Sequence, residues 1–118
     1  PMMSEGQSRG GLAEVVALAL GEGIAYDEQG NVKTGTLMDF FRPTAGEVPN
    51  YDTDFTVTPS RHHPIGAKGV GESPHVGGVP CFSNAVHDAF RPFGLRQTNM
   101  PHDHWRIWQT ANRLGMHD

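Results

Sequence analysis

A glycine-rich segment in the second half of the sequence carries a single carboxylate. Residues 66–74 read GAKGVGESP, with three glycines before Glu72. Because glycine lets a backbone approach another group closely, this segment could deliver the Glu72 carboxylate to a bound ligand, where it would act as a general base. The ordinary alternative is an exposed turn that carries a glutamate, and the residues alone favour that alternative by roughly 3 to 1.

The same segment does not fit the two common phosphate-binding motifs. Lys68 follows Gly66 too closely for a P-loop, and no Gly-Lys-Ser or Gly-Lys-Thr sequence occurs. Pro74 stands where a dinucleotide-binding fingerprint needs its last glycine. The formal net charge of -4 provides no basic stripe for a phosphate backbone, so nucleic acid is not expected as a partner.

The histidines and the single cysteine do not form a recognisable metal site. His62 with His63, and His102 with His104, lack the spacing of known zinc ligands, so no metal-binding residue is predicted. Cys81 is the only cysteine, which excludes an internal disulfide and indicates a reducing compartment. We expect Cys81 to be structural, as a small apolar residue on a helix.

Apolar residues at helical spacing predict three helices that could position the glycine-rich segment. These helices cover residues 10–20, 82–90 and 105–114. Gly21 and Gly23 end the first of them. The first helix lies before the glycine-rich segment and the other two lie after it.

Short β elements are predicted between the first and second helices. Residues 24–26 and 32–34 flank a turn whose Gly30 can take a positive φ, as a hairpin requires. Residues 53–58 alternate apolar and polar side chains, which predicts a strand. Residues 59–80 hold many prolines and glycines and are predicted to form a long functional loop. The predicted fold class is therefore α+β.

The size of the chain limits what it can do alone. At 118 residues it forms one domain at most, and such a domain buries only about two-thirds of its unfolded surface. No apolar run reaches membrane-spanning length. The start, PMMSE, lacks a signal-peptide pattern, which predicts a chain entered midway or a processed start.

Two motifs together resemble a known enzyme family. Residues 66–72 resemble the Gly-x-Lys-Gly-Val-Gly-Glu loop of the xanthine oxidase family of molybdenum hydroxylases. Residues 5–11, EGQSRGG, are similar to that family's Glu-Gly-Gln-x-x-Gly-Gly entry into a helix, and residues 26–30 match the hairpin that follows. The resemblance covers essentially the whole chain. It identifies residues 1–118 as a single segment, the C-terminal part of the molybdenum-cofactor-binding domain of a larger subunit.

Other segments look most like one branch of that family, the large chains of aerobic carbon monoxide dehydrogenases. They are residues 62–65, 73–86 and 100–103. This resemblance implies an oxidoreductase that converts carbon monoxide and water to carbon dioxide. An aldehyde or heteroaromatic-ring hydroxylase of the same family is the alternative, and a non-catalytic interaction domain is the alternative from another class.

The family resemblance also assigns roles to individual residues. It implies that Glu72 is the catalytic base beside the molybdenum. It implies that the Gln7 side-chain amide hydrogen-bonds the pterin, and that the backbone of Lys68, Gly69, Val70 and Gly71 lines the cofactor. In this family a pterin dithiolene holds the molybdenum, which explains why no protein metal ligands are expected.

Cofactors and partners are implied in the same way. The cofactor is expected to be molybdenum with molybdopterin cytosine dinucleotide, and copper would be held by a cysteine loop outside this chain. The remainder of the molybdenum subunit, a flavin subunit with FAD and an iron-sulfur subunit with 2Fe-2S clusters are the expected partners, in an oligomer. The expected location is the cytoplasm, with the inner face of the cell membrane as an alternative.

Overall fold

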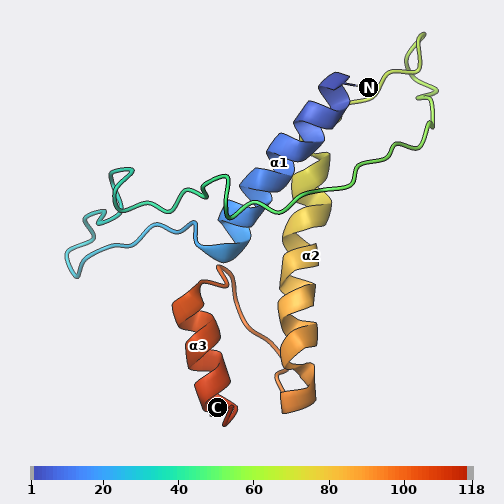
Figure 1. Ribbon diagram of the computed structural model, residues 1–118. Coiled ribbons are helices and arrows are strands. Elements are labelled where there is room, and N and C mark those ends of the chain that lie inside the picture. The colour runs from blue at the N-terminus through green and yellow to red at the C-terminus, as the bar shows by residue number, and fades with distance from the viewer. Residues whose placement is uncertain (1, 117–118) are drawn as a thin grey trace.

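Three helices and long extended connections make up the chain in the computed structural model, which describes residues 2–116 (Figure 1). The helices are α1 (Met2–Leu20), α2 (Ser73–Phe90) and α3 (His104–Arg113), and a short 3-10 turn, η1 (Arg91–Phe93), follows α2. The three predicted helices are therefore present. None of the helices in the described range is long and apolar enough to cross a membrane.

Helix α1 begins at Met2, before the predicted start at Gly10. Its periodic apolar half faces the interior, because Val15, Val16, Ala17 and Ala19 are its buried residues. The glycines of its first half have low helix propensity, which concealed the first turns from sequence analysis. The helix ends where predicted, at the Gly21 position.

Helices α1 and α2 cross at two positions where a glycine faces a larger residue. A Cβ atom built on Gly11 would lie 2.8 Å from Cγ of Pro74, and one built on Gly78 would lie 2.9 Å from Cγ1 of Val15. Both distances are shorter than real side chains allow, so the backbones approach this closely only because glycine occupies these positions. In Figure 1, the first turns of α2 lie beside the middle of α1.

The predicted loop over residues 59–80 is too long, because α2 begins at Ser73 and includes the last part of it. Gly77, Gly78 and Pro80 all disfavour a helix by intrinsic propensity, and Pro80 cannot donate a backbone hydrogen bond. Packing on α1 supplies the stabilisation that propensity does not provide. The helix predicted from Phe82 is therefore correct in type and wrong in its start.

The predicted hairpin is reduced to its turn. Tyr26 and Val32 form an isolated antiparallel bridge, and no strand is present in residues 2–116. The Asp27 carboxylate accepts hydrogen bonds from the backbone and side-chain nitrogens of Asn31 at 2.8 and 2.9 Å, and Gly30 has φ +85° as predicted. Local side-chain bonds hold this turn without a sheet.

The strand predicted over residues 53–58 is also wrong, so the α+β class is replaced by helices and extended chain. Phe55 and Val57 are exposed, and no second strand in the described range offers backbone partners, which a strand requires. The segment is instead tied to α1 at its first residue, because the Thr53 hydroxyl donates to Oε1 of Glu5 at 3.4 Å. The hydroxyl of the preceding Tyr51 also donates to the Leu12 carbonyl oxygen, at 3.3 Å. Residues 54–58 are exposed on both faces, so alternation alone did not identify a buried face or a backbone partner.

His102 joins all three helices. Its backbone N–H donates to the carbonyl oxygen of Ala19 at the end of α1 over 2.6 Å, and its ring Nε2 is hydrogen-bonded to Oγ of Ser83 in α2 over 2.7 Å. The residue is 2% exposed. Helix α3 begins two residues later, where the Asp103 side chain accepts a hydrogen bond from the backbone of Arg106 at 2.8 Å.

The chain is larger in surface and extent than a self-contained protein of its mass. Its solvent-accessible surface is 9258 Å², whereas a compact monomer of this size exposes about 6,300 Å². Its radius of gyration is 18.1 Å, compared with about 13.5 Å for a compact domain. Much apolar surface therefore stays open, including Met38 and Val57 at 94% and 89% exposure.

The helix crossing predicts opposite effects for two neighbouring glycines. Gly78→Ala places a methyl group against Val15, and overpacking of this kind costs about 1–3 kcal/mol. A Cβ on Gly77 meets nothing within 4 Å, so Gly77→Ala should gain up to about 1 kcal/mol of helix propensity. We expect the first substitution to lower the thermal unfolding midpoint of the purified protein and the second to leave it unchanged or raise it. Equal midpoints would contradict the close packing.

Burial of His102 predicts a loss of stability in mild acid. Desolvation, followed by the charges of His87 and Arg106, lowers the pKa of His102 from its ordinary value of 6.5. The unfolded chain therefore takes up this proton before the folded chain does as the pH falls through 6.5, and stability is lost in that range. The free energy of unfolding, measured at about pH 7.5 and about pH 5.5, should fall more between these two values for the wild type than for His102→Gln. A His62→Gln control should behave as the wild type.

Candidate functional site

Glu72 lies at the N-cap position of α2, at the end of the glycine-rich segment. Its backbone carbonyl accepts hydrogen bonds from the N–H groups of His75 and Val76 at 3.1 and 3.3 Å, and Ser73 N–H donates to the Val70 carbonyl oxygen at 3.2 Å. Its side chain makes no capping bond, and the residue is exposed. The backbone is thus fixed while the carboxylate remains free to act on a ligand.

The other end of the glycine-rich segment is held at Gly66. This residue has φ +70°, and a Cβ built on it would lie 2.8 Å from Cβ of Pro59, so only glycine fits. Its N–H donates to the His63 carbonyl oxygen at 2.9 Å, and its carbonyl oxygen accepts from Ser60 N–H at 3.0 Å. The residues between Gly66 and Glu72 therefore form a loop anchored at both ends.

Gln7 and the glycine-rich segment meet in space, although they are far apart in the sequence. A Cβ built on Gly71 would lie 3.5 Å from Nε2 of Gln7, which places the side-chain amide directly beside the loop. Gln7 is in the first half of α1, and Gly71 precedes α2. The crossing of these two helices therefore brings together the two predicted motifs.

A hollow of about 570 Å³ opens at this place. It is lined by residues 69–73 and by Val76, so Gly69, Val70, Gly71 and Glu72 all face it. Lys68 instead lines a neighbouring hollow of about 380 Å³, together with Ser4, Ile65 and residues 55–59. The structure thus brings together five of the six predicted site residues and turns Lys68 toward an adjacent space.

The loop fits a polar, multiply hydrogen-bonding cofactor such as a pterin. Among the described residues, no backbone N–H group from Ala67 to Glu72 donates to another residue. Consecutive free N–H groups and the Gln7 amide can therefore donate to a ligand placed over the glycines, where no side chain intervenes. Molybdopterin offers the ring nitrogens and carbonyl oxygen of its pterin and a side-chain phosphate as acceptors, so the residues present suit it.

Protein side chains that could hold a metal ion do not gather in the described part of the chain. No group of three or more His, Cys, Asp or Glu residues is placed for metal binding in residues 2–116. Cys81 is an exposed residue in the middle of α2. Any metal at the Glu72 hollow would therefore need ligands from a cofactor or from other residues.

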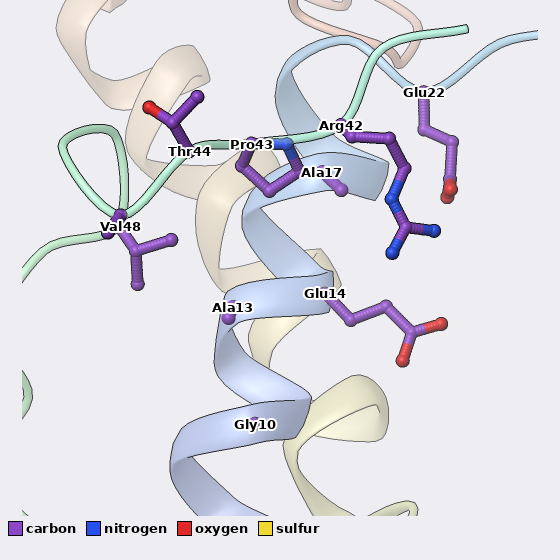
Figure 2. Close-up of a pocket in the computed structure, with 10 residues that line it drawn as sticks. Gly10, Ala13, Glu14, Ala17, Glu22, Arg42, Pro43, Thr44 and Val48 are labelled. Carbon is purple, nitrogen blue, oxygen red and sulfur yellow. The ribbon is translucent and has the colours of Figure 1, made fainter. Parts of the chain in front are cut away.

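Sequence analysis missed two charged or titratable residues next to the site, Glu14 and His75. Nε2 of His75 lies 3.1 Å from Oε2 of Glu14, which links α2 to α1. Glu14 also lines a pocket of about 410 Å³ on α1 with Glu22 and Arg42. Figure 2 shows the side chains of these three residues extending on the same side of that pocket. No local pattern could have indicated a contact between residues so far apart in the sequence.

This chain is similar to known proteins of one family. A family model described as the molybdopterin cofactor-binding domain matches residues 1–49, which include Gln7. The carbon monoxide dehydrogenase large chain of Afipia carboxidovorans is 62% identical over 117 residues, covering 99% of this chain and 14% of that protein. The nicotine 6-hydroxylase large subunit of Paenarthrobacter nicotinovorans is 38% identical over 101 residues, covering 86% of this chain and 12% of that protein.

A solved structure agrees with the fold as well as the sequence. The crystal structure of the Cu,Mo-CO dehydrogenase in its carbon monoxide reduced state has a TM-score of 0.95 and 62% identity, covering all of this chain and 15% of that one. The chain thus spans 14% of the length of the large chain it matches in A. carboxidovorans. On these likenesses, the chain belongs to the xanthine oxidase family of molybdenum hydroxylases and corresponds to a segment of a carbon monoxide dehydrogenase large chain.

Proposed function

We propose that the protein containing this chain is a molybdenum-dependent carbon monoxide dehydrogenase, and that residues 1–118 are the C-terminal part of its cofactor-binding domain. The observation that carries this proposal is the 62% identity over 117 residues to the large chain of such an enzyme. Carbon monoxide and water become carbon dioxide, two protons and two electrons. The bound molybdopterin cofactor supplies the two-electron oxidation when it is present.

Within this reaction, Glu72 is the general base. Its carboxylate is exposed at the hollow and forms no capping bond, so it can take a proton from the water whose oxygen enters carbon dioxide. Its place at the N-cap of a packed helix fixes the backbone that carries the base, which limits where the carboxylate can lie. The exposed carboxylate and the anchored loop both support this role.

Gln7 and the loop backbone hold the cofactor in this proposal. The Gln7 amide beside Gly71 offers both donors and an acceptor to the pterin. Gly69, Val70 and Gly71 line the same hollow, and their N–H groups donate no hydrogen bond among the described residues. Lys68 lines the adjacent hollow, so its backbone would contact a more distant part of the cofactor, such as the nucleotide of a molybdopterin cytosine dinucleotide.

The rest of the assembly follows from the same proposal. The remainder of the molybdenum subunit covers the apolar surface that this chain leaves open. A flavin subunit with FAD and an iron-sulfur subunit with 2Fe-2S clusters carry the electrons away. Copper, if the enzyme uses it, binds to a cysteine outside this chain, since Cys81 lies on α2 away from the hollow. The proposed location is the cytoplasm or the inner face of the cell membrane.

A heteroaromatic-ring or aldehyde hydroxylase is the second candidate. The 38% identity to the nicotine 6-hydroxylase large subunit favours it, since the same segment serves a different substrate there. The residues of the hollow would keep their roles in such an enzyme. A non-catalytic interaction domain, the third alternative, requires instead that Glu72 be dispensable for turnover.

Removing the base charge should stop the reaction without displacing the cofactor. Glu72→Gln keeps the shape of the side chain and removes the proton acceptor, so the rate of carbon monoxide oxidation by the purified complex should fall at least about a hundredfold. Molybdenum content should stay near that of the wild type. Glu28→Gln, an exposed glutamate in the Asp27 turn, is the control and should retain activity. A Glu72→Gln complex with full turnover would remove the catalytic assignment.

A further inference from the structure

We propose that Glu14 and His75 are positioning residues for the Glu72 turn, an inference that rests on the proposed function of Glu72. Neither residue faces the hollow that Glu72 lines. Their side chains meet at the crossing of α1 and α2, with His75 Nε2 and Glu14 Oε2 3.1 Å apart. We infer that this pair sets the orientation in which α2 presents the carboxylate.

Glu14 and His75 lie on the faces that α1 and α2 turn toward each other. Gly11, Glu14 and Val15 share one face of α1, because residues three and four apart lie on the same side of a helix. They meet the corresponding face of α2, formed by Pro74, His75 and Gly78. Two of these three contacts are close apolar approaches, and one is the polar contact between His75 and Glu14.

The contacts of this crossing differ in whether they limit the rotation of α2. The contacts of Pro74 with Gly11 and of Gly78 with Val15 fix how near the two helices lie, but apolar contacts have no preferred direction. The approach of His75 Nε2 to Glu14 Oε2 is the polar contact of this crossing. It lies beside the line of the two apolar contacts, because His75 points in a different direction around the helix axis from Pro74 and Gly78. It therefore limits rotation of α2 about its own axis at the turn that carries Glu72.

The His75 ring has few polar partners in this chain. Nδ1 of His75 is buried and has no hydrogen-bond partner among the described residues. The approach of Nε2 to Oε2 of Glu14 is therefore the polar contact that the ring makes with α1. Replacing the Glu14 carboxylate by an apolar group would leave both ring nitrogens without a partner from α1.

His75 is joined to Glu72 through the backbone of the first turn of α2. His75 N–H donates to the carbonyl oxygen of Glu72 at 3.1 Å, so the two residues share the first turn of α2. The Glu72 side chain has no hydrogen bond of its own to hold it. The backbone of that turn therefore determines where the carboxylate lies. A small displacement of reacting groups can lower the reaction rate by a large factor.

The contact between His75 and Glu14 is partly solvated, which separates positioning from general stability. The side chains of His75 and Glu14 are 30% and 63% exposed, and exposed pairs contribute little to folding. Glu22 provides a matched control, because it lines the same pocket as Glu14 beside Arg42 (Figure 2), whereas the polar contact of the His75 ring is with Glu14. Loss of rate without loss of assembly is therefore the expected signature.

The test uses the complete enzyme with Glu14→Leu, Glu14→Gln, His75→Leu and Glu22→Leu. Glu14→Leu should lower kcat about tenfold and leave KM within about twofold, because neither residue touches substrate. Glu14→Gln keeps an acceptor oxygen and should recover most of the rate. Glu22→Leu should match the wild type. The Glu14→Leu, His75→Leu double variant should be no slower than either single variant, since one contact is lost in all three.

A second readout does not depend on turnover. Hydrogen exchange of the His75 and Val76 amides, which donate to Glu72, should be about tenfold faster in Glu14→Leu and unchanged in Glu22→Leu. Wild-type kcat and exchange rates in Glu14→Leu and His75→Leu would overturn the inference. If instead Glu72→Gln retained turnover, the proposed function would fail, and the exchange rates alone would still decide whether the pair holds the turn.

Discussion

The site depends on the close approach of α1 and α2, which glycine permits on both helices. A side chain on Gly11 or Gly78 would collide with Pro74 or Val15, so larger residues would force the helices apart. This approach places Gln7 of α1 against Gly71 at the start of α2. It also places Glu72 at the mouth of the hollow, since the carboxylate belongs to the N-cap of the helix that packs there.

Sequence analysis located the candidate site better than it located the elements around it. The three glycines before Glu72 are a local pattern, and the Gln7 motif depends on a resemblance that does not require knowledge of packing. The start of α2 is different, because Gly77, Gly78 and Pro80 argue against a helix unless α1 lies beside it. Tertiary packing overrides propensity at this point, and no local signal carries that information.

The missing strand has a related explanation. Residues 53–58 alternate as a half-buried strand does, yet Val57 is 89% exposed and no partner strand occurs in the described range. An alternating pattern reports two different environments without saying which chain provides them. The contact between Glu14 and His75 was invisible for a similar reason, because it joins two helices through residues that have no shared local motif.

The open surface and the matching large chain lead to the same interpretation, a segment that works within a larger enzyme. The surface of 9258 Å² is large for this mass, and apolar side chains such as Met38 and Val57 stay exposed. The contribution of this chain is a positioned carboxylate, an amide and a row of free backbone N–H groups. The remaining walls of the active site must come from other residues.

The most direct test is to measure which substrate the enzyme oxidises. The complete complex purified with this chain in place should be assayed for dye-linked oxidation of carbon monoxide and of a panel of small aldehydes and heteroaromatic rings. The account predicts rapid oxidation of carbon monoxide and little or no oxidation of the panel. Oxidation of aldehydes or heteroaromatic rings without any oxidation of carbon monoxide would contradict it, and would leave the chain as a segment of another hydroxylase of the same family.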